Sequence, residues 1–184
     1  MKIIDPSLLK HSITGLNLTG ETLEEEMGSS TVMLLFLRHF GCLFSREMVL
    51  DIRRICENNP FAPQPIFFFQ GNIEQGKQFF DQYWPQARAI ADEQRDFYSG
   101  FEVTKGSFMQ LFGAEVWKCG LRATAKGIMI GKPIGNPFTL SLTVLAQRNL
   151  ILWQYHSKHA GDFPDYSIIE QYADSPVKVL QMPE

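Results

Sequence analysis

Residues 31–58 read TVMLLFLRHFGCLFSREMVLDIRRICEN, and this stretch decides the fold. Residues 31–37 are an unbroken apolar run of strand length, which is typical of a strand buried on both faces of a sheet. Gly41 then permits a sharp turn. From Ser45 onward the apolar residues recur with the 3.6-residue period of an amphipathic helix. The sequence therefore predicts that Cys42 lies in the turn that leads into a helix N-terminus.

This position favours a reactive thiol. Unpaired backbone N–H groups and the helix dipole stabilise negative charge at a helix N-terminus, and the thiolate is the nucleophilic form of cysteine. Arg38 and His39 upstream and Arg46 downstream add positive charge. We therefore expect Cys42 to ionise more readily than a free cysteine, with Arg38 and Arg46 stabilising the charge. The alternative is a small buried cysteine that only fills space.

The run LRHFGCLFSRE at 37–47 resembles the active-site loop of the thioredoxin-fold AhpC/TSA group. It is most similar to the peroxiredoxin-like branch that includes prostamide/prostaglandin F synthase-like proteins, whose pattern is R-x-x-G-C-x-x-C-R-E. A second match lies in LILWQYHSKHAGDFP at 150–164, where that branch has a strand followed by a motif ending in H-A-G-D. The resemblance implies a single α/β domain over residues 1–184 with a thioredoxin-like fold. Its central mixed sheet would be flanked by helices, with an N-terminal extension and a helical insert at about 93–136.

The resemblance also implies a thiol-dependent redox protein, an antioxidant oxidoreductase of the thiol-disulfide or thiol-peroxidase type. Ser45 stands where the pattern has its second cysteine, so Cys42 would be a single nucleophile resolved by an external thiol. True peroxiredoxins carry P-x-x-x-T/S-x-x-C, but Leu35 and His39 stand at the Pro and Thr/Ser positions here. Peroxide and disulfides are the expected substrates, and a small thiol or a thioredoxin-like protein is the expected reductant. A non-catalytic thioredoxin-fold module that binds a protein is the alternative.

Other residues with a predicted role lie near this loop or in the insert. Ser45 is expected to cap the helix or to donate its hydroxyl to the Cys42 thiolate. Cys56 falls on the same helix about 20 Å from Cys42, too far for a disulfide, and is expected in the core. Cys119 is the one internal candidate for a resolving thiol, although its register favours a packing role. The resemblance implies a cis-proline at Pro137, facing the active cysteine.

Composition excludes several classes of function. The 184 residues are 45% hydrophobic and 20% charged, which is typical of one folded soluble domain. The net charge of −3 offers no basic stripe for nucleic acid or an anionic membrane. An N-terminus of MKIIDPSLLKH does not suit a signal peptide, and three cysteines, an odd number, favour reduced thiols. We therefore expect a cytoplasmic protein, with a homodimer left open.

We expect neither a cofactor nor a metal. His156, His159 and Asp162 are residue types that bind metals, but an H-x-x-H spacing is a weak signal without nearby cysteines. Asp162 through Asp165 are expected to cap a final helix instead.

Strands alternating with helices predict βαβ units and a parallel core. Short early elements are expected in GLNLTG and at 19–27, where Thr22 and Glu25 fit a capping box. Further strands are predicted at 65–70, 87–91, 137–146 and 150–156, the last two as a hairpin. Helices are predicted at 72–84, 92–98, 106–126 (one long or two short) and 165–172, with a loop at 127–135.

Overall fold

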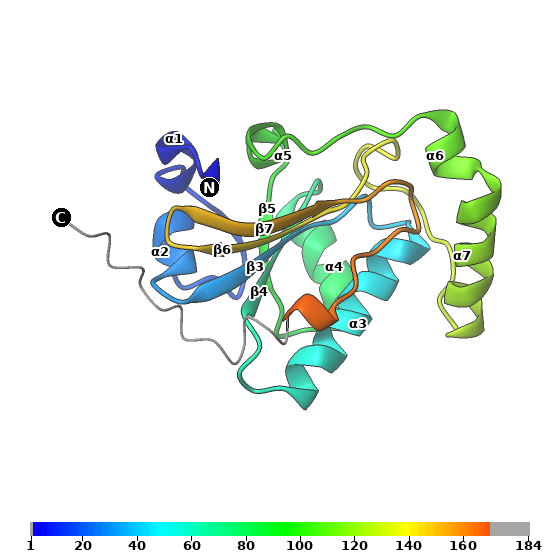
Figure 1. Ribbon diagram of the computed structural model, residues 1–184, viewed down its shortest axis with the longest axis horizontal. Helices are drawn as coiled ribbons and strands as arrows, with labels where there is room; N and C mark the ends of the chain where they lie inside the picture. The colour runs from blue at the N-terminus through cyan, green and yellow to red at the C-terminus, as the bar shows by residue number, and fades with distance from the viewer. Residues whose placement is uncertain (1, 170–184) are drawn as a thin grey trace.

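A seven-stranded mixed sheet forms the centre of the computed structural model, which describes residues 2–169 (Figure 1). The strand order is β1-β7-β6-β3-β4-β5-β2. The strands are β1 (Lys2–Ile3), β2 (Gly15–Leu16), β3 (Thr31–Phe36), β4 (Gln64–Phe69), β5 (Arg88–Ala91), β6 (Leu142–Gln147) and β7 (Leu150–His156). The helices are α1 (Pro6–Leu9), α2 (Leu23–Met27), α3 (Leu43–Asn58), α4 (Ile73–Tyr83), α5 (Asp96–Gly100), α6 (Phe108–Phe112) and α7 (Ala114–Ala125).

Strand β3 is central and buried on both faces, as its apolar run predicts. It pairs in parallel with β4 and antiparallel with β6. Val32, Leu34 and Phe36 enter one core, while Met33 and Leu35 enter the core on the opposite face. Successive side chains of a strand alternate between faces, so a strand that is apolar throughout needs cover on both sides.

Helices supply that cover in two layers. Helices α3 and α4 pack on one face through side chains such as Met48, Ile52 and Phe80. Helices α1, α2 and α5 pack on the other through Leu9, Leu23 and other apolar side chains. This α/β arrangement is the predicted mixed sheet flanked by helices.

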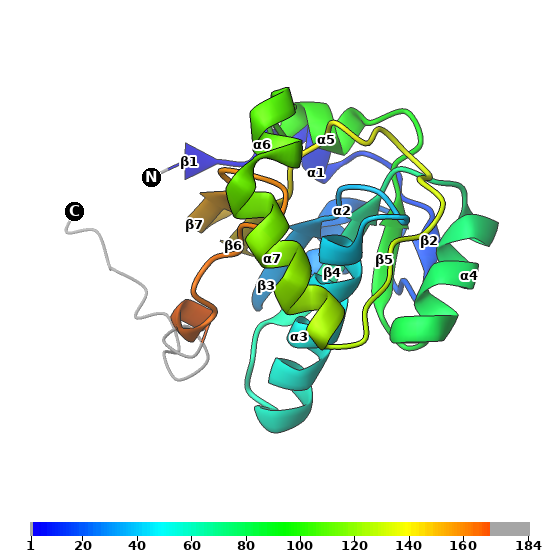
Figure 2. The same ribbon diagram turned by 90° about the vertical axis from the view of Figure 1, so that its right-hand side faces the viewer.

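The predicted insert contains α5, which packs on the sheet, and α6 and α7, which pack in a separate apolar cluster. Figure 1 shows α7 beside α3 at one end of the molecule, and Figure 2 views the two helices from that end. Extended backbone at Gly113 divides the expected 106–126 helix into α6 and α7. Glu47 of α3, whose side chain is only 1% exposed, accepts hydrogen bonds from Arg122 Nη2 at 2.9 Å and pairs with Lys126 Nζ at 2.9 Å. These ion pairs hold the two helices together.

Most predicted elements are confirmed, with shifts at their ends. Asn72 caps α4 in a full capping box with Gln75. Thr22 accepts from the Glu25 backbone N–H at the start of α2, which is one half of the predicted box. The hairpin strand expected from 137 begins only at Leu142. Before it, Thr139 forms an isolated bridge with Lys105, and the carbonyls of Pro137 and Thr139 accept from Arg38. Of the final helix expected at 165–172, residues 167–169 are helical and 170–172 lie outside the described residues.

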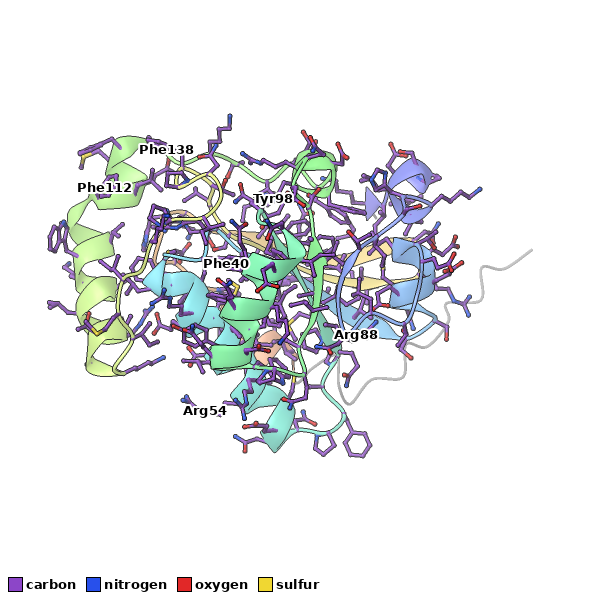
Figure 3. The ribbon with its side chains drawn as sticks, turned by 180° about the vertical axis from the view of Figure 1, so that it is seen from behind. Phe40, Arg54, Arg88, Tyr98, Phe112 and Phe138 are labelled. Atoms are coloured by element: carbon purple, nitrogen blue, oxygen red, sulfur yellow. The ribbon has the colours of Figure 1, made fainter. Side chains whose placement is uncertain are left out.

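Tyr98 of α5 fixes the ends of the two central parallel strands (Figure 3). Its hydroxyl is fully buried and lies 2.5 Å from the carbonyl oxygen of Leu37 and 2.8 Å from that of Phe68. Leu37 follows β3 directly and Phe68 is near the end of β4, so this contact sets where the chain leaves the sheet for the Cys42 turn.

Tyr98→Phe removes this hydroxyl and leaves both buried carbonyls without its proton. We expect the free energy of unfolding to fall by about 1–3 kcal/mol, the cost of an unsatisfied buried polar group. Urea denaturation measures the change. Tyr83→Phe, at a half-buried position on α4, is the control and should change the free energy of unfolding by less than about 0.5 kcal/mol. Equal effects of the two variants would contradict the role of the Tyr98 hydroxyl.

Candidate active site

Cys42 is the N-cap residue of α3, as the sequence predicts. Its carbonyl oxygen accepts the first helical hydrogen bond, from Arg46 N at 3.3 Å, and its own N–H donates to the His39 carbonyl at 3.0 Å. The side chain is only 5% exposed. The sulfur therefore lies at the positive end of the α3 dipole, where negative charge is stabilised.

Arg38 contacts this sulfur directly. Its Nη1 donates to Cys42 Sγ at 2.9 Å, its Nε donates to Thr139 O at 2.7 Å and its Nη2 donates to Pro137 O at 2.9 Å. The residue is 6% exposed, and within residues 2–169 no carboxylate forms an ion pair with it. A buried cation needs a compensating charge. Of the three acceptors only Sγ belongs to a side chain, so Cys42 is the side-chain partner of this buried cation.

Gln70 holds the segments on either side of Arg38. Its amide nitrogen donates to the Arg38 carbonyl, and its Oε1 accepts from Asn136 N at 3.1 Å and from Thr139 Oγ1 at 3.4 Å. Sequence reasoning missed this residue. The available signal was its place directly after β4, because polar residues at the carboxyl ends of adjacent parallel strands meet at one edge of the sheet.

Ser45 and Arg46 stabilise the turn without contacting the sulfur in the described hydrogen bonds. Ser45 is buried, and its Oγ accepts from the Arg38 backbone N–H at 3.2 Å, so the predicted capping of α3 and the donation to Cys42 are both replaced by this contact. Arg46 Nε donates to Phe40 O at 3.2 Å, and its guanidinium lies over the Tyr83 ring. Arg38 therefore provides the direct charge contact that was expected of both arginines.

His39 is half-buried, and it lines a cavity that Cys42 also lines. Its Nδ1 is buried and has no hydrogen-bond partner within residues 2–169. Burial lowers the pKa of His39 to about 4, and the positive charges of Arg38 and Arg46 act in the same direction. The imidazole is therefore neutral at pH 7 and a weak base.

The other two cysteines differ from Cys42. Burial and the nearby Glu57 carboxylate raise the pKa of Cys56 to about 11, which makes it unreactive, in keeping with its predicted core position. Cys119 is half-buried and packs against the same apolar cluster as Cys42. Its Cβ lies close to Gly161, where a side chain would collide with it. All three cysteines are free thiols.

Pro137 lies where the resemblance implies, but its geometry differs. Its carbonyl accepts from Arg38, and it lines a cavity together with Cys42. The predicted cis bond is wrong, because every peptide bond in the described part of the chain is trans.

The acidic residues near His156 and His159 make hydrogen bonds within the protein. Asp162 accepts from the Tyr155 hydroxyl at 2.9 Å, and Asp165 accepts from Ser167 N at 3.0 Å, as expected of a residue that starts a helix. Within residues 2–169 no three His, Cys, Asp or Glu side chains gather as a metal would require.

Comparisons with solved structures identify the fold. The Xanthomonas campestris bacterioferritin comigratory protein matches with a TM-score of 0.61 at 10% identity, over 92% of this chain and 96% of its own. A PrxQ mutant from Xylella fastidiosa matches with a TM-score of 0.58 at 13% identity, over 94% and 91%. A thiol peroxidase from Chromobacterium violaceum gives 0.52 at 14% identity, over 77% and 69%. No family model and no curated protein matches the chain.

The architecture is therefore the thioredoxin-like fold of peroxiredoxins, which confirms the predicted fold class. At these identities the likeness concerns the fold, and the chemistry has to be argued from the site itself. No helix within residues 2–169 is long and apolar enough to cross a membrane.

The lowered pKa of His39 makes stability depend on pH. Because the pKa is about 4 in the folded protein and 6.5 for an ordinary histidine, the unfolded chain binds more protons between these values. We expect the free energy of unfolding to decrease as the pH falls from about 6.5 to about 4, and the decrease to be shallower in His39→Asn. Urea denaturation across this range measures both. An NMR titration that placed the His39 imidazole near 6.5 would contradict the expectation.

Proposed function

We propose that this protein is a thiol peroxidase-like oxidoreductase in which the Cys42 thiolate attacks a peroxide and an external thiol reduces the product. The observation that carries the proposal is the 2.9 Å contact between Arg38 Nη1 and Cys42 Sγ, made by a buried guanidinium without a carboxylate partner in the described chain. Such a contact stabilises an ionised sulfur, and the thiolate is the nucleophile in peroxide reduction.

The reaction has two stages. The Cys42 thiolate attacks the terminal oxygen of a hydroperoxide, the O–O bond breaks, and the sulfur becomes a sulfenic acid. The departing alkoxide takes a proton from water and leaves as an alcohol. An external thiol then displaces water from the sulfenic acid to form a mixed disulfide, and a second thiol releases Cys42 together with the oxidised reductant.

The surroundings of Cys42 support peroxide chemistry while departing from the peroxiredoxin pattern. The Thr or Ser hydroxyl of that pattern is absent, and neutral His39 stands in its place. The Arg38 guanidinium and the α3 N-terminus remain as groups that stabilise an anion. One structural neighbour is described as reducing alkyl peroxides, which supports a peroxide as the substrate.

Within this proposal Cys42 works as a single nucleophile, as Ser45 in place of a second cysteine suggests. Cys119 shares a cluster with Cys42, but its Cβ packs against Gly161, which also lies against the Phe44 ring. We assign Cys119 to packing and the resolving role to a small thiol or a thioredoxin-like protein. Three free thiols fit a reducing compartment such as the cytoplasm.

We further propose that the chain belongs to the prostamide/prostaglandin F synthase-like branch. Its second motif, His159 to Asp162, packs against the start of α3. Ala160 N donates to Gln110 O at 2.8 Å, and Gly161 lies against the Phe44 ring. The motif thus supports the Cys42 turn from outside.

A non-catalytic protein-binding module is the second candidate. Exposed apolar side chains near Cys42 favour it, among them Phe112, Trp117 and Ile130. A binding module would not use Cys42 chemically, so substitution of Cys42 distinguishes it from a peroxidase.

Cys42→Ser should abolish peroxide consumption in the presence of dithiothreitol, because a hydroxyl does not ionise at neutral pH. Cys56→Ser and Cys119→Ser should keep most of the activity, since an external thiol completes the cycle. Loss of hydrogen peroxide measures the rate. Equal rates in wild type and Cys42→Ser would support the binding module. Loss of activity in Cys119→Ser, with activity kept in Cys56→Ser, would assign the resolving role to Cys119.

Arg38→Met should make Cys42 a weaker nucleophile, because the cation that contacts its sulfur is removed. We expect the rate of Cys42 alkylation at pH 7 to fall by about tenfold, in line with the loss of one hydrogen bond to a charged group. Iodoacetamide labelling over time at this pH, read by mass spectrometry, gives the rate. Arg46→Met is the matched control, because Arg46 binds backbone carbonyls. An unchanged rate in Arg38→Met, or an equal loss of rate in both variants, would contradict the role of Arg38.

A further inference from the structure

A cavity of about 450 Å³ opens on Cys42 between the start of α3 and helix α7. Its volume is within the range of sites that hold small organic molecules. Arg38, His39 and Thr124 contribute the charged and polar side chains, and Arg38 contacts the sulfur. The remaining wall is mostly apolar and includes Leu43, Phe44, Leu111, Val116, Pro133 and Pro137.

Large apolar side chains are exposed at the rim of this cavity. Phe112, Trp117, Leu121 and Ile130 all line it, and they are 56%, 72%, 73% and 76% exposed. Figure 3 shows Phe112 at the insert end of the molecule, with Phe138 nearby. Exposed apolar groups gathered around a hollow mark a binding site, because a folded chain otherwise tends to bury such surface.

Gly120 lies in the middle of α7 and lines the cavity. A Cβ added there would meet no atom within 4 Å, so neighbouring side chains do not require a glycine. Glycine inside a helix lowers helix stability relative to alanine. The small size of Gly120 instead leaves open volume in the cavity that Cys42 also lines.

We propose that the cavity binds the apolar organic group of a hydroperoxide, with Gly120 as a residue that determines specificity. The inference rests on the proposed peroxidase function and names its preferred substrates. The hydroperoxide group reaches Cys42 at the polar end, and the organic group lies along Val116, Gly120 and Leu121. A compact oxidant such as hydrogen peroxide makes none of these apolar contacts, so the insert selects for larger apolar peroxides.

The occupant is a small molecule rather than a protein segment for a chemical reason. Thr124 on α7 donates its hydroxyl to Gly120 O, and the other polar side chains of the lining, Arg38 and His39, belong to the turn that carries Cys42. A bound peptide needs partners for its backbone N–H and C=O groups along its length. The apolar wall offers few such partners. It suits a hydrocarbon group with one reactive polar end.

The test compares cumene hydroperoxide with hydrogen peroxide. Gly120→Phe fills the open volume, so kcat/KM for cumene hydroperoxide should fall by about tenfold or more relative to hydrogen peroxide. Gly120→Ala adds little volume and should retain the wild-type preference. Ala125→Phe places the same ring at an exposed position outside the cavity lining on the same helix, and it should also retain the preference.

A binding readout separates this inference from the proposed activity. Cumyl alcohol has the organic group without the peroxide, and it should quench or shift the fluorescence of Trp117 in a saturable way. Gly120→Phe should lose this response, and Gly120→Met should weaken it if the phenylalanine variant folds poorly. If wild type consumes neither peroxide yet binds cumyl alcohol, the peroxidase proposal fails and the cavity assignment stands.

Three results would overturn the inference. One is an unchanged ratio of the two kcat/KM values in a folded Gly120→Phe protein. Another is the absence of cumyl alcohol binding by the wild type. The third is a Gly120→Phe protein that differs from wild type only in its reduction by a thioredoxin, which would assign the cavity to the protein reductant.

Discussion

The burial of the Arg38 guanidinium is the constraint on which the site depends. A permanent positive charge that is 6% exposed must find acceptors inside the protein, and it finds two backbone carbonyls and one sulfur. The carbonyls belong to Pro137 and Thr139, so Arg38 holds the segment that precedes β6. The same side chain therefore determines the path of a distant loop and the electrostatic environment of Cys42.

The fold brings these groups together at the carboxyl ends of two central parallel strands. Strand β3 leads into Arg38 and Cys42, and β4 leads into Gln70, whose amide connects the Arg38 carbonyl with the 136–139 segment. Helix α7 then covers the turn and is held to α3 through Glu47. The sheet thus positions Cys42, while the insert supplies much of the wall of the cavity beside it.

Local patterns made much of this predictable. The apolar run of β3, the helical period after Ser45 and the Asn72 cap concern residues close in sequence, so periodicity and capping rules identify them. The contact from Arg38 to Thr139 joins residues 101 positions apart, and no local signal reports it. Ser45 was assigned to the wrong partner for the same reason, because its hydroxyl accepts from a backbone N–H outside its own helix. The cavity escaped prediction because its walls come from three separate segments.

The crossing of two backbones beside Cys42 constrains how this chain can diverge. Gly131 N donates to Gly41 O at 2.9 Å, and a Cβ on Gly41 would lie 2.4 Å from Gly131 O. A Cβ on Gly131 would in turn collide with the Arg46 guanidinium. The clash at Gly41 is with backbone atoms, so this position accepts no side chain unless the 128–135 loop moves away, whereas at Gly131 the flexible Arg46 side chain can move instead. In homologues Gly41 should persist or be replaced together with the loop, which makes it a marker of whether a relative retains the same covered sulfur.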